Sequence, residues 1–475
     1  MPSYPGFCGP SYTSQSPLAR PERCMNFYPE RLEVGDGQQT VLYPTPGVES
    51  FSESTSGPCR GLFAQNGRCF TVMSDTLYEL NSAGTFTSLG TVEGDANPAT
   101  FATNGDGGDE LFVTSGNKGY IYNLSTGDFS NPINDVTMGG MVDGYFVALD
   151  QSTSTFKISD LLDGTTWDST QILQRNSAPD QWKALLVKNP IIFLFGSETT
   201  EPIFDAGGAP FPFLPVPNLV IPYGISAPFS AKSIGNTVLW LTETKDGGRQ
   251  IIGMQGYDAQ RVSTHAVEFA LSQYNNVSDA VAFTYQDQGH GFYELNFPSA
   301  NATWVYDVSL GLWHERGQWN SDAMEYEVWG PQYHAYVFDK HLVGDPCNGI
   351  IYNMSIDVFT DVDGKGLRRQ RIPPALQSEQ QRLFWDRFQL HLDVGIGLVS
   401  GQGEDPQVML QLSRDGGITW GSERWRSAGK IGEYLHRAQW WRLGSGRNLL
   451  PSITMTDPVP WRILDAYIRI EGSAH

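Results

Sequence analysis

The sequence predicts an all-β fold on the basis of three observations. Helical periodicity is almost absent from the 475 residues, and apolar residues occur instead in short or alternating runs. These runs are separated by Gly, Asn, Asp and Ser, which favour tight turns. Gly (51 residues) and Pro (29 residues) are abundant, as expected for many short strands joined by turns. The best helical candidate is 373–388, and even this pattern can continue into a strand.

A strand–turn–strand unit recurs along the first three quarters of the chain. One twisted four-stranded sheet cannot cover its own apolar face, so neighbouring sheets packed around an axis close the core. Repeats of ~40–50 residues are the sequence signature of that arrangement. We therefore predict a β-propeller of six or seven blades over residues 58–364, with a large β-sandwich assembly as the alternative. The repeats lie at 76–90, 119–132, 144–158, 188–208, 237–254, 291–307 and 333–354.

Three segments depart from the repeat. Residues 1–57 are predicted to form an N-terminal extended segment. Residues 201–228 contain seven prolines among apolar side chains, and proline cannot donate to a central strand ladder. This Pro-rich loop is expected either to pack on its own domain or to meet a partner. Residues 365–475 are enriched in Arg and Trp and are predicted to form a C-terminal β module.

Candidate partner contacts follow from the last two segments. Apolar side chains of the Pro-rich loop, and Arg and Trp of the C-terminal module, are residue types that supply binding energy at protein interfaces. A strand face with arginines lying over tryptophans is the alternative for the C-terminal group. The candidates are Phe211, Phe213, Leu214, Val216, Trp440, Trp441 and Arg442.

Charge is unevenly distributed along the chain. The net charge is −21, with 16 Lys and Arg against 41 Asp and Glu in residues 1–364 and 15 against 11 in residues 365–475. An acidic body disfavours wrapping of DNA, because phosphate neutralisation needs cations. It is compatible with DNA sliding past, and also with an acidic surface that maintains solubility.

We predict no metal site, no cofactor and no membrane insertion. The five cysteines are scattered without a C-x-x-C pair, so buried thiols are favoured over disulfides or structural zinc, including at Cys59 and Cys69. The Asp-rich stretches 104–110 and 361–366 are interpreted as turns rather than calcium loops. No apolar run approaches ~18 residues, and no signal peptide is visible, so folding in a cytoplasm is expected.

The stretch "SRDGGITW" (413–420) fits the Asp-box motif best known from sialidases. In this motif the Ser413 and Asp415 side chains are expected to accept backbone N–H groups, Gly417 to adopt the left-handed conformation, and Trp420 to pack beneath. The motif thus explains a stable hairpin without catalysis. No nucleophile or metalloprotease motif is found, so no catalytic residue is predicted. A carbohydrate-binding or glycan-hydrolysing propeller remains the alternative, because the many acids would supply a carboxylate pair by chance.

Three parts of the sequence together resemble a known family. They are "RCMNFYPE" (23–30), "YGISAPFSAKSIGNTVLWL" (223–241) and the C-terminal combination that begins "VMLQLSRDGGITW" and ends "YIRIEG" (408–472). These look like the packaged-DNA stabilisation proteins of short-tailed phages, the tail hub or nozzle proteins of the Salmonella-phage type. The likeness spans most of the chain in order and matches in length.

The resemblance implies a non-enzymatic structural virion protein that is assembled in the bacterial host cytoplasm. Such hubs form a ring, expected to be a hexamer, below the portal and its adaptor. The ring extends the DNA channel, retains packaged DNA without sequence-specific binding, and holds the tail needle or plug and the tailspikes or fibres. The propeller-like fold of the family agrees with the repeats. A DNA-binding repeat protein is a third alternative, which the acidic body disfavours.

Overall fold

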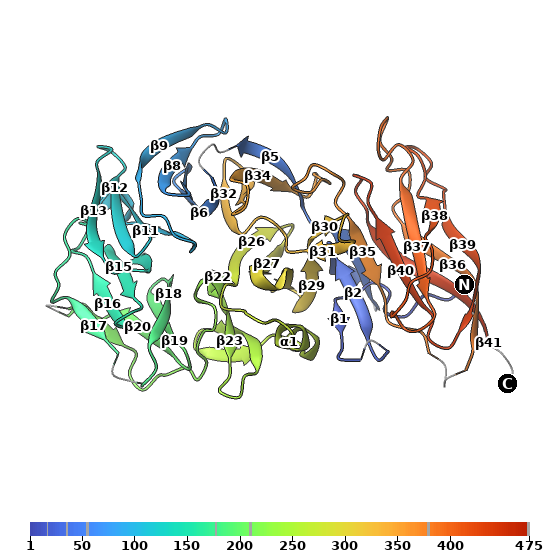
Figure 1. Ribbon diagram of the computed structural model, residues 1–475, viewed down its shortest axis with the longest axis horizontal. Helices are drawn as coiled ribbons and strands as arrows, with labels where there is room; N and C mark the ends of the chain where they lie inside the picture. The colour runs from blue at the N-terminus through green and yellow to red at the C-terminus, as the bar shows by residue number, and fades with distance from the viewer. Residues whose placement is uncertain are drawn as a thin grey trace.

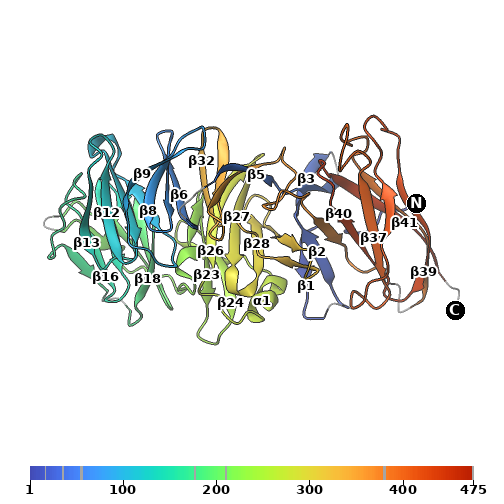
Figure 2. The ribbon, with the colours of Figure 1, turned by 45° about the horizontal axis from the view of Figure 1, so that its top comes forward.

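The computed structural model describes residues 1–16, 18–34, 37–53, 57–175, 178–208, 211–377 and 381–472. It contains a ring of β-sheets and, beside it, a β-sandwich that carries both chain termini (Figure 1). Figure 2 shows the same side-by-side arrangement after rotation. The predicted all-β class is confirmed. No helix in the described ranges has the length and apolar character needed to cross a bilayer.

Within the described residues, seven four-stranded antiparallel blades surround one axis, so the prediction of six or seven blades resolves to seven. Six blades are separate sheets, and the remaining one, blade 6, is part of a ten-stranded sheet. Blades 1 to 3 are β6 (Cys59–Gln65), β7 (Arg68–Met73), β8 (Thr76–Leu80) and β9 (Phe86–Thr91); β10 (Thr100–Thr103), β11 (Glu110–Ser115), β12 (Lys118–Asn123) and β13 (Phe129–Asn134); and β14 (Met138–Val142), β15 (Tyr145–Asp150), β16 (Thr155–Ile158) and β17 (Ile172–Gln174). Blades 4 and 5 are β18 (Trp182–Lys188), β19 (Ile191–Gly196), β20 (Thr200–Asp205) and β21 (Phe213–Pro215); and β22 (Lys232–Ile234), β23 (Thr237–Glu243), β24 (Arg249–Gln255) and β25 (Asp258–Arg261). Blades 6 and 7 are β26 (Val281–Asp287), β27 (His290–Phe297), β28 (Ala302–Asp307) and β29 (Leu312–Arg316); and β5 (Gly47–Glu53), β32 (Tyr333–Val337), β33 (Lys340–Gly344) and β34 (Ile350–Ser355).

Apolar side chains fill the space between neighbouring blades. Phe70 and Val72 of blade 1, for example, share one buried cluster with Leu111 and Val113 of blade 2. Alternate residues of a strand point to opposite faces, so a central strand that is apolar on both faces packs against both neighbours. This explains why the inner strands read as continuous apolar runs rather than alternating ones.

The seventh blade joins distant parts of the chain. Its outer strand is β5, which pairs antiparallel with β34, so that Ser50 lies opposite Tyr352. A strand that precedes blade 1 in sequence therefore closes the ring. The domain boundary predicted from the sequence placed residues 1–57 outside the propeller, whereas β5 is a strand of the propeller.

The C-terminal module is a sandwich of two five-stranded layers, to which the N-terminal residues contribute. The first layer has the order β3 (Phe27–Val34), β4 (Gly37–Pro44), β41 (Ile463–Gly472), β36 (Leu383–Leu392) and β39 (Ala438–Gly446). The second has the order β2 (Pro21–Met25), β35 (Arg369–Ile372), β40 (Leu450–Met455), β37 (Gln407–Ser413) and β38 (Arg424–Ser427), with β1 (Tyr12–Thr13) paired to β2. Residues 1–57 thus form strands of both units rather than a separate segment.

One continuous sheet connects the two units. β2 pairs in parallel with β29 of blade 6 at Met25 and Glu315, and antiparallel with β35 of the sandwich. A short hairpin of β30 (Gln318–Asn320) and β31 (Glu325–Glu327) follows blade 6. The sandwich core contains the buried indoles of Trp385, Trp440 and Trp461.

Two local expectations differ from the structure. The Pro-rich loop contains β20 and β21, so it belongs to blade 4 instead of forming one extended loop; 209 and 210 lie outside the described residues. Pro202 lies inside β20 and has no N–H to donate. Its carbonyl accepts from Val216 N (2.9 Å), and β21 ends at Pro215, just before Val216, so the missing donor interrupts no further pairing. The helix suggested at 373–388 is replaced by β36 from Leu383 onward.

The structure instead has a short helix that the periodicity missed. Helix α1 (His265–Ser272) is capped at its N-terminus by Thr264, whose side chain accepts from Val267 N. Ser and Thr are favoured at this position because they satisfy a free N–H of the first turn. Three single turns of 3-10 helix complete the described elements: η1 (Gly105–Gly107), η2 (Pro228–Ser230) and η3 (Pro298–Ala300).

Candidate functional site

The Asp-box forms a loop between β37 and β38 that is held by its own side chains. The Ser413 hydroxyl accepts from Gly417 N at 2.7 Å and donates to the Asp415 carboxylate at 2.6 Å. The same carboxylate accepts from the backbone N–H of Ile418 and Thr419 at 3.0 and 2.9 Å. These hydrogen bonds, led by the one from Ser413, hold the pKa of Asp415 well below its usual range. The carboxylate is thus occupied by its own loop.

Gly417 and Trp420 of this loop lie near Leu450. Gly417 has a φ of +103°, a conformation that disfavours any side chain. Trp420 is half-buried. Together with Leu450, these two residues form one wall of a cleft between the sandwich and the propeller.

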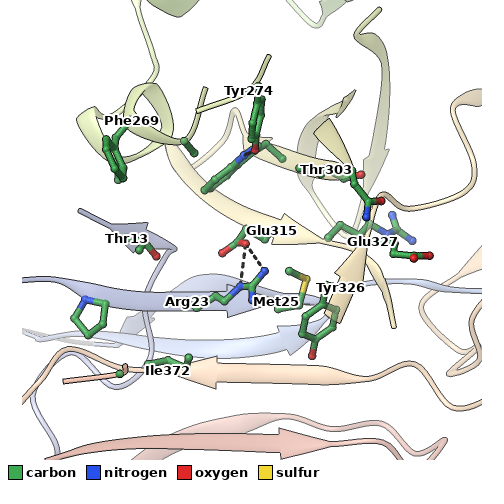
Figure 3. Close-up of a pocket in the computed structure, with 18 of the residues that line it drawn as sticks. Thr13, Arg23, Met25, Phe269, Tyr274, Thr303, Glu315, Tyr326, Glu327 and Ile372 are labelled. Atoms are coloured by element: carbon green, nitrogen blue, oxygen red, sulfur yellow. Dashed lines mark hydrogen bonds and ion pairs between the residues drawn. The ribbon is translucent and has the colours of Figure 1, made fainter. Parts of the chain in front are cut away.

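This cleft has a volume of about 500 Å³. Figure 3 shows its centre, where Arg23 of β2 faces Glu315 of β29, with Phe269 and Tyr274 on the far side. The Arg23 guanidinium donates from Nε to Glu315 Oε2 at 3.0 Å, and its Nη2 lies 2.9 Å from the same oxygen. Ser11 donates to the other oxygen of Glu315 at 2.9 Å. The ion pair therefore fixes the propeller against the sandwich.

The arginines of "RRQR" (368–371) serve the interior. Arg371 is buried and donates to four backbone carbonyls, those of Gly6, Phe7, Pro10 and Arg23. Arg369 is also buried, and its burial lowers its pKa to about 9. Because Arg369 and Arg371 are buried, these two side chains offer no surface to nucleic acid.

The candidate partner contacts are divided between core and surface. Phe213 lies in the core beneath blade 4, and Trp440 lies in the sandwich core. The rings of Phe213 and Trp440 are buried within the chain, so these two residues are not available for contact with a partner. The remaining candidates are accessible: Leu214, Trp441 and Arg442 are exposed, and Phe211 and Val216 are half-buried.

Exposed Arg and Trp side chains gather where the two sandwich layers end. β38 and β39 are the last strands of their sheets. Trp440 donates from Nε1 to Arg424 O at 2.8 Å, and Arg426 donates to Gln439 O at 2.9 Å, which ties the two strands together. We call this surface the Arg/Trp edge; its exposed residues are Arg424, Trp425, Arg426, Trp441 and Arg442.

Comparison with known families accounts for both units. Residues 19–359 match the family model described as bacteriophage P22 Gp10, β-propeller, and residues 368–471 match the one described as bacteriophage P22 Gp10, β-sandwich. The chain belongs to the bacteriophage P22 Gp10 family. Membership confirms the resemblance to packaged-DNA stabilisation proteins of short-tailed phages, and it makes the chain a structural protein of a phage tail.

Other similarities of this P22 Gp10 family member are slight. No curated protein sequence matches it. It resembles the computationally designed Ika8 protein at 10% identity over 70% of this chain and 99% of that chain, with a TM-score of 0.39. A chain of the mitotic checkpoint complex is 13% identical over 65% of this chain and 93% of that chain, with a TM-score of 0.42. At these scores the likeness has no bearing on function.

Two further features of the site could not be found from sequence. Arg23 and Glu315 form their ion pair between residues separated by most of the propeller. The Arg/Trp edge depends on which of two adjacent tryptophans, Trp440 or Trp441, faces outward. The available signal for the edge was the local enrichment in Arg and Trp, which identified the segment but not the exposed side chains.

Proposed function

We propose that this protein is the hub, or nozzle, of a short-tailed phage tail. Copies form a ring, most simply a hexamer, below the portal and its adaptor. The ring extends the DNA channel, retains packaged DNA, and anchors the tail needle or plug and the tailspikes or fibres. The match of both units to one phage family, over nearly the whole chain, supports this role. The role requires no catalytic residue.

The charge distribution fits a channel component. DNA that is retained and later released must move past the protein, and an acidic surface offers few phosphate contacts. The buried Arg369 and Arg371 withdraw two of the C-terminal cations from solvent. DNA therefore passes without sequence-specific binding. The ring is assembled in the host cytoplasm and functions in the virion.

We assign self-assembly to the Arg/Trp edge. It lies at the end of the molecule opposite to blades 2 and 3 (Figure 1), whose exposed loops include Asp106, Asp128, Asp143 and Asp168. A contact between two different surfaces at opposite ends of a chain is heterologous, and such contacts close into rings when the rotation permits. The opposite charges of the two surfaces would favour the encounter of neighbouring copies.

Electron microscopy of the purified protein mixed with portal–adaptor complexes tests the hub role. We expect a ring added below the adaptor, and the protein should also be present in virions. A chain that remains monomeric with the adaptor, and that is missing from virions, contradicts the role. For the Arg/Trp edge, the triple change Arg424→Glu, Arg426→Glu and Arg442→Glu should abolish the ring, while the exposed control Arg31→Glu should not.

The exposed part of the Pro-rich loop is assigned to a tail partner. Deletion of 207–219 is unsuitable as a test, because it would remove β21 from blade 4. Leu214→Glu changes only an exposed side chain and should block attachment of that partner while leaving the melting temperature unchanged. Normal infectivity of phage that carry this variant would refute the assignment.

The Asp-box does not support the glycan-hydrolysing alternative. Its motif carboxylate, Asp415, is engaged within the hairpin. Saturable glycan binding, or release of reducing sugar, would restore this alternative.

A further inference from the structure

We propose that the central channel of the propeller contains a binding site for a small oxyanion, in which the Lys232 ammonium and the Gln332 side-chain amide are the protein donors. The shared chemistry is one carboxylate or phosphate group. It is supplied either by a free anion or by an acidic side chain that a partner inserts. The site is separate from the Arg/Trp edge and does not depend on the hub role.

The channel is built by all seven blades. Its volume is about 630 Å³, and its lining comes from the innermost strands β6, β10, β14, β18, β22, β26 and β32 with their flanking residues. At one end it continues into a hollow that includes Asp95 and Asp279 and shares Gln332 with the channel. At the other end it continues into a hollow that includes Asp287 and shares His334. Small solutes can therefore reach the lining from either face.

The lining has the opposite charge to the rest of the molecule. The chain has 52 Asp and Glu, yet none of them is among the described residues that line the channel. Lys232 is the one Lys or Arg in that lining. An unpaired cation in a confined, acid-free channel attracts anions, because the surrounding protein screens its charge less than bulk water does.

Lys232 and Gln332 both lack a partner within the described parts of the chain. Lys232, at the start of β22, has no hydrogen bond or ion pair there, and burial lowers its pKa. Gln332 is only 6% exposed; its backbone N–H donates to Gly344 O, but its side-chain amide has no partner. Both side chains line the channel, and neither end group is sealed off from solvent. An oxyanion would accept hydrogen bonds from both.

Two neighbouring polar groups of the channel, Thr284 and His334, are already engaged. Thr284 donates from Oγ1 to Ser233 O at 3.2 Å. His334 and His341 lie 2.9 Å apart, Nε2 to Nδ1. Burial lowers the pKa of His334 to about 3, so its ring stays neutral. Lys232 and Gln332 are therefore available to an incoming anion, as are the hydroxyls of Thr103, Ser233 and Tyr333 in the same lining.

The mouths of the channel limit the size of the anion. Asp95 and Asp279 at one end and Asp287 at the other would repel a long polyanion. A nucleic acid strand is thus disfavoured, whereas a compact anion with one or two charges can enter. Lys232 would neutralise one of these charges.

Calorimetric titration of the full chain with inorganic phosphate, citrate and acetate tests the proposal. We expect saturable binding of at least one probe, and at least tenfold weaker binding in both Lys232→Met and Gln332→Leu. Lys183→Met, which alters an exposed lysine of β18, should bind like the natural chain. Lys232→Met should melt at no lower temperature, because Lys232 has no hydrogen bond or ion pair within the described residues to lose.

Two further measurements identify the source of the anion and the residue that binds it. The acidic peptide acetyl-Gly-Glu-Gly-amide is titrated in parallel. Binding of the peptide without binding of the free anions assigns the source to a partner's acidic side chain. The chemical shift of the ¹³C-dimethylated Lys232 side chain should change on binding of the probe. The proposal is overturned if no probe binds saturably, or if binding persists unchanged in folded Lys232→Met.

Discussion

Ser50 in β5 lies directly opposite Tyr352 in β34, so the strand that leads into the propeller and the strand that ends it share one sheet. The ring is therefore closed by hydrogen bonds rather than by a covalent link. Blade 7 packs between blades 6 and 1, and this packing depends on the pairing of β5 with β34. Radial packing is complete only when every blade has two neighbours. Changes at β5 should thus affect the whole propeller.

Gly47→Ala should weaken this closure. A Cβ at Gly47 would lie 2.4 Å from Val358 O and 2.7 Å from Thr360 O, both backbone atoms that cannot move away freely. We expect a loss of stability of ~1–3 kcal/mol, which is typical of overpacking. Thermal unfolding of the full chain provides the measurement. Gly94→Ala is the matched control, since only the Asp75 side chain is near, at 3.5 Å; equal melting temperatures for the two variants would contradict the closure role.

Arg371→Lys should release the N-terminal residues from the sandwich. Arg371 donates to the carbonyls of Gly6, Phe7, Pro10 and Arg23, and a lysine cannot reproduce this planar set of donors. The expected result is faster amide exchange over residues 6–13 and a loss of ~2–3 kcal/mol, about the size of hydrogen bonds to a charged group. The exposed Arg382→Lys should leave exchange unchanged. Unaltered protection in Arg371→Lys would show that the strand pairing alone holds this segment.

The sequence predicted most of the blades well because all but blade 7 are local. Blades 1 to 5 use four strands that are consecutive in sequence, so their hairpins leave a repeating pattern of apolar runs and turns. The closing strand β5 and the sandwich strands β2 to β4 leave no such pattern. β5 and β2 pair with strands from distant parts of the chain. β3 and β4 form a local hairpin, but a strand or hairpin alone does not indicate which sheet edge it will join.

For the candidate partner contacts, the sequence did not show which of two adjacent apolar residues faces the surface. Neighbouring residues of a strand face opposite sides of the sheet, so Phe213 and Leu214, and likewise Trp440 and Trp441, had to divide between core and surface. Both members of each pair are apolar, and the sequence alone does not say which one is buried. Packing decides: Phe213 and Trp440 fill cores, while Leu214 and Trp441 are each 51% exposed.

The buried Glu294 should make propeller stability depend on pH. Burial raises its pKa to about 7, although Arg316 lies 3.0 Å away and opposes the shift. An unfolded glutamate titrates near ~4.3. The folded chain therefore holds a proton that the unfolded chain has lost, and the stabilisation present below pH ~4.3 disappears as the pH rises toward 7.

Glu294→Gln should remove this dependence. The variant has no titratable group at this position, so the informative quantity is the slope of the unfolding free energy against pH. Between pH 5 and pH 8 the natural chain should lose up to ~3 kcal/mol relative to the variant, at about 1.4 kcal/mol for each unit of pKa shift. Denaturant unfolding across this range gives the two slopes. The exposed Glu325→Gln should retain the natural slope, and parallel curves for Glu294→Gln and the natural chain would refute the assignment.

Asp415→Ala should loosen the Asp-box without altering the remainder of the sandwich. The carboxylate accepts from Ile418 N and Thr419 N, so these two amides should exchange faster in the variant. The pKa of Asp415 lies below its usual range because Ser413 and Thr419 donate to the ionised form. Its stabilisation is therefore present above pH ~3.9 and is lost as the pH falls below that value. Site-resolved hydrogen exchange at pH 7 is the measurement, with Asp246→Ala in an exposed turn as the control. If Ile418 and Thr419 remain protected in Asp415→Ala, the turn glycines alone order this loop.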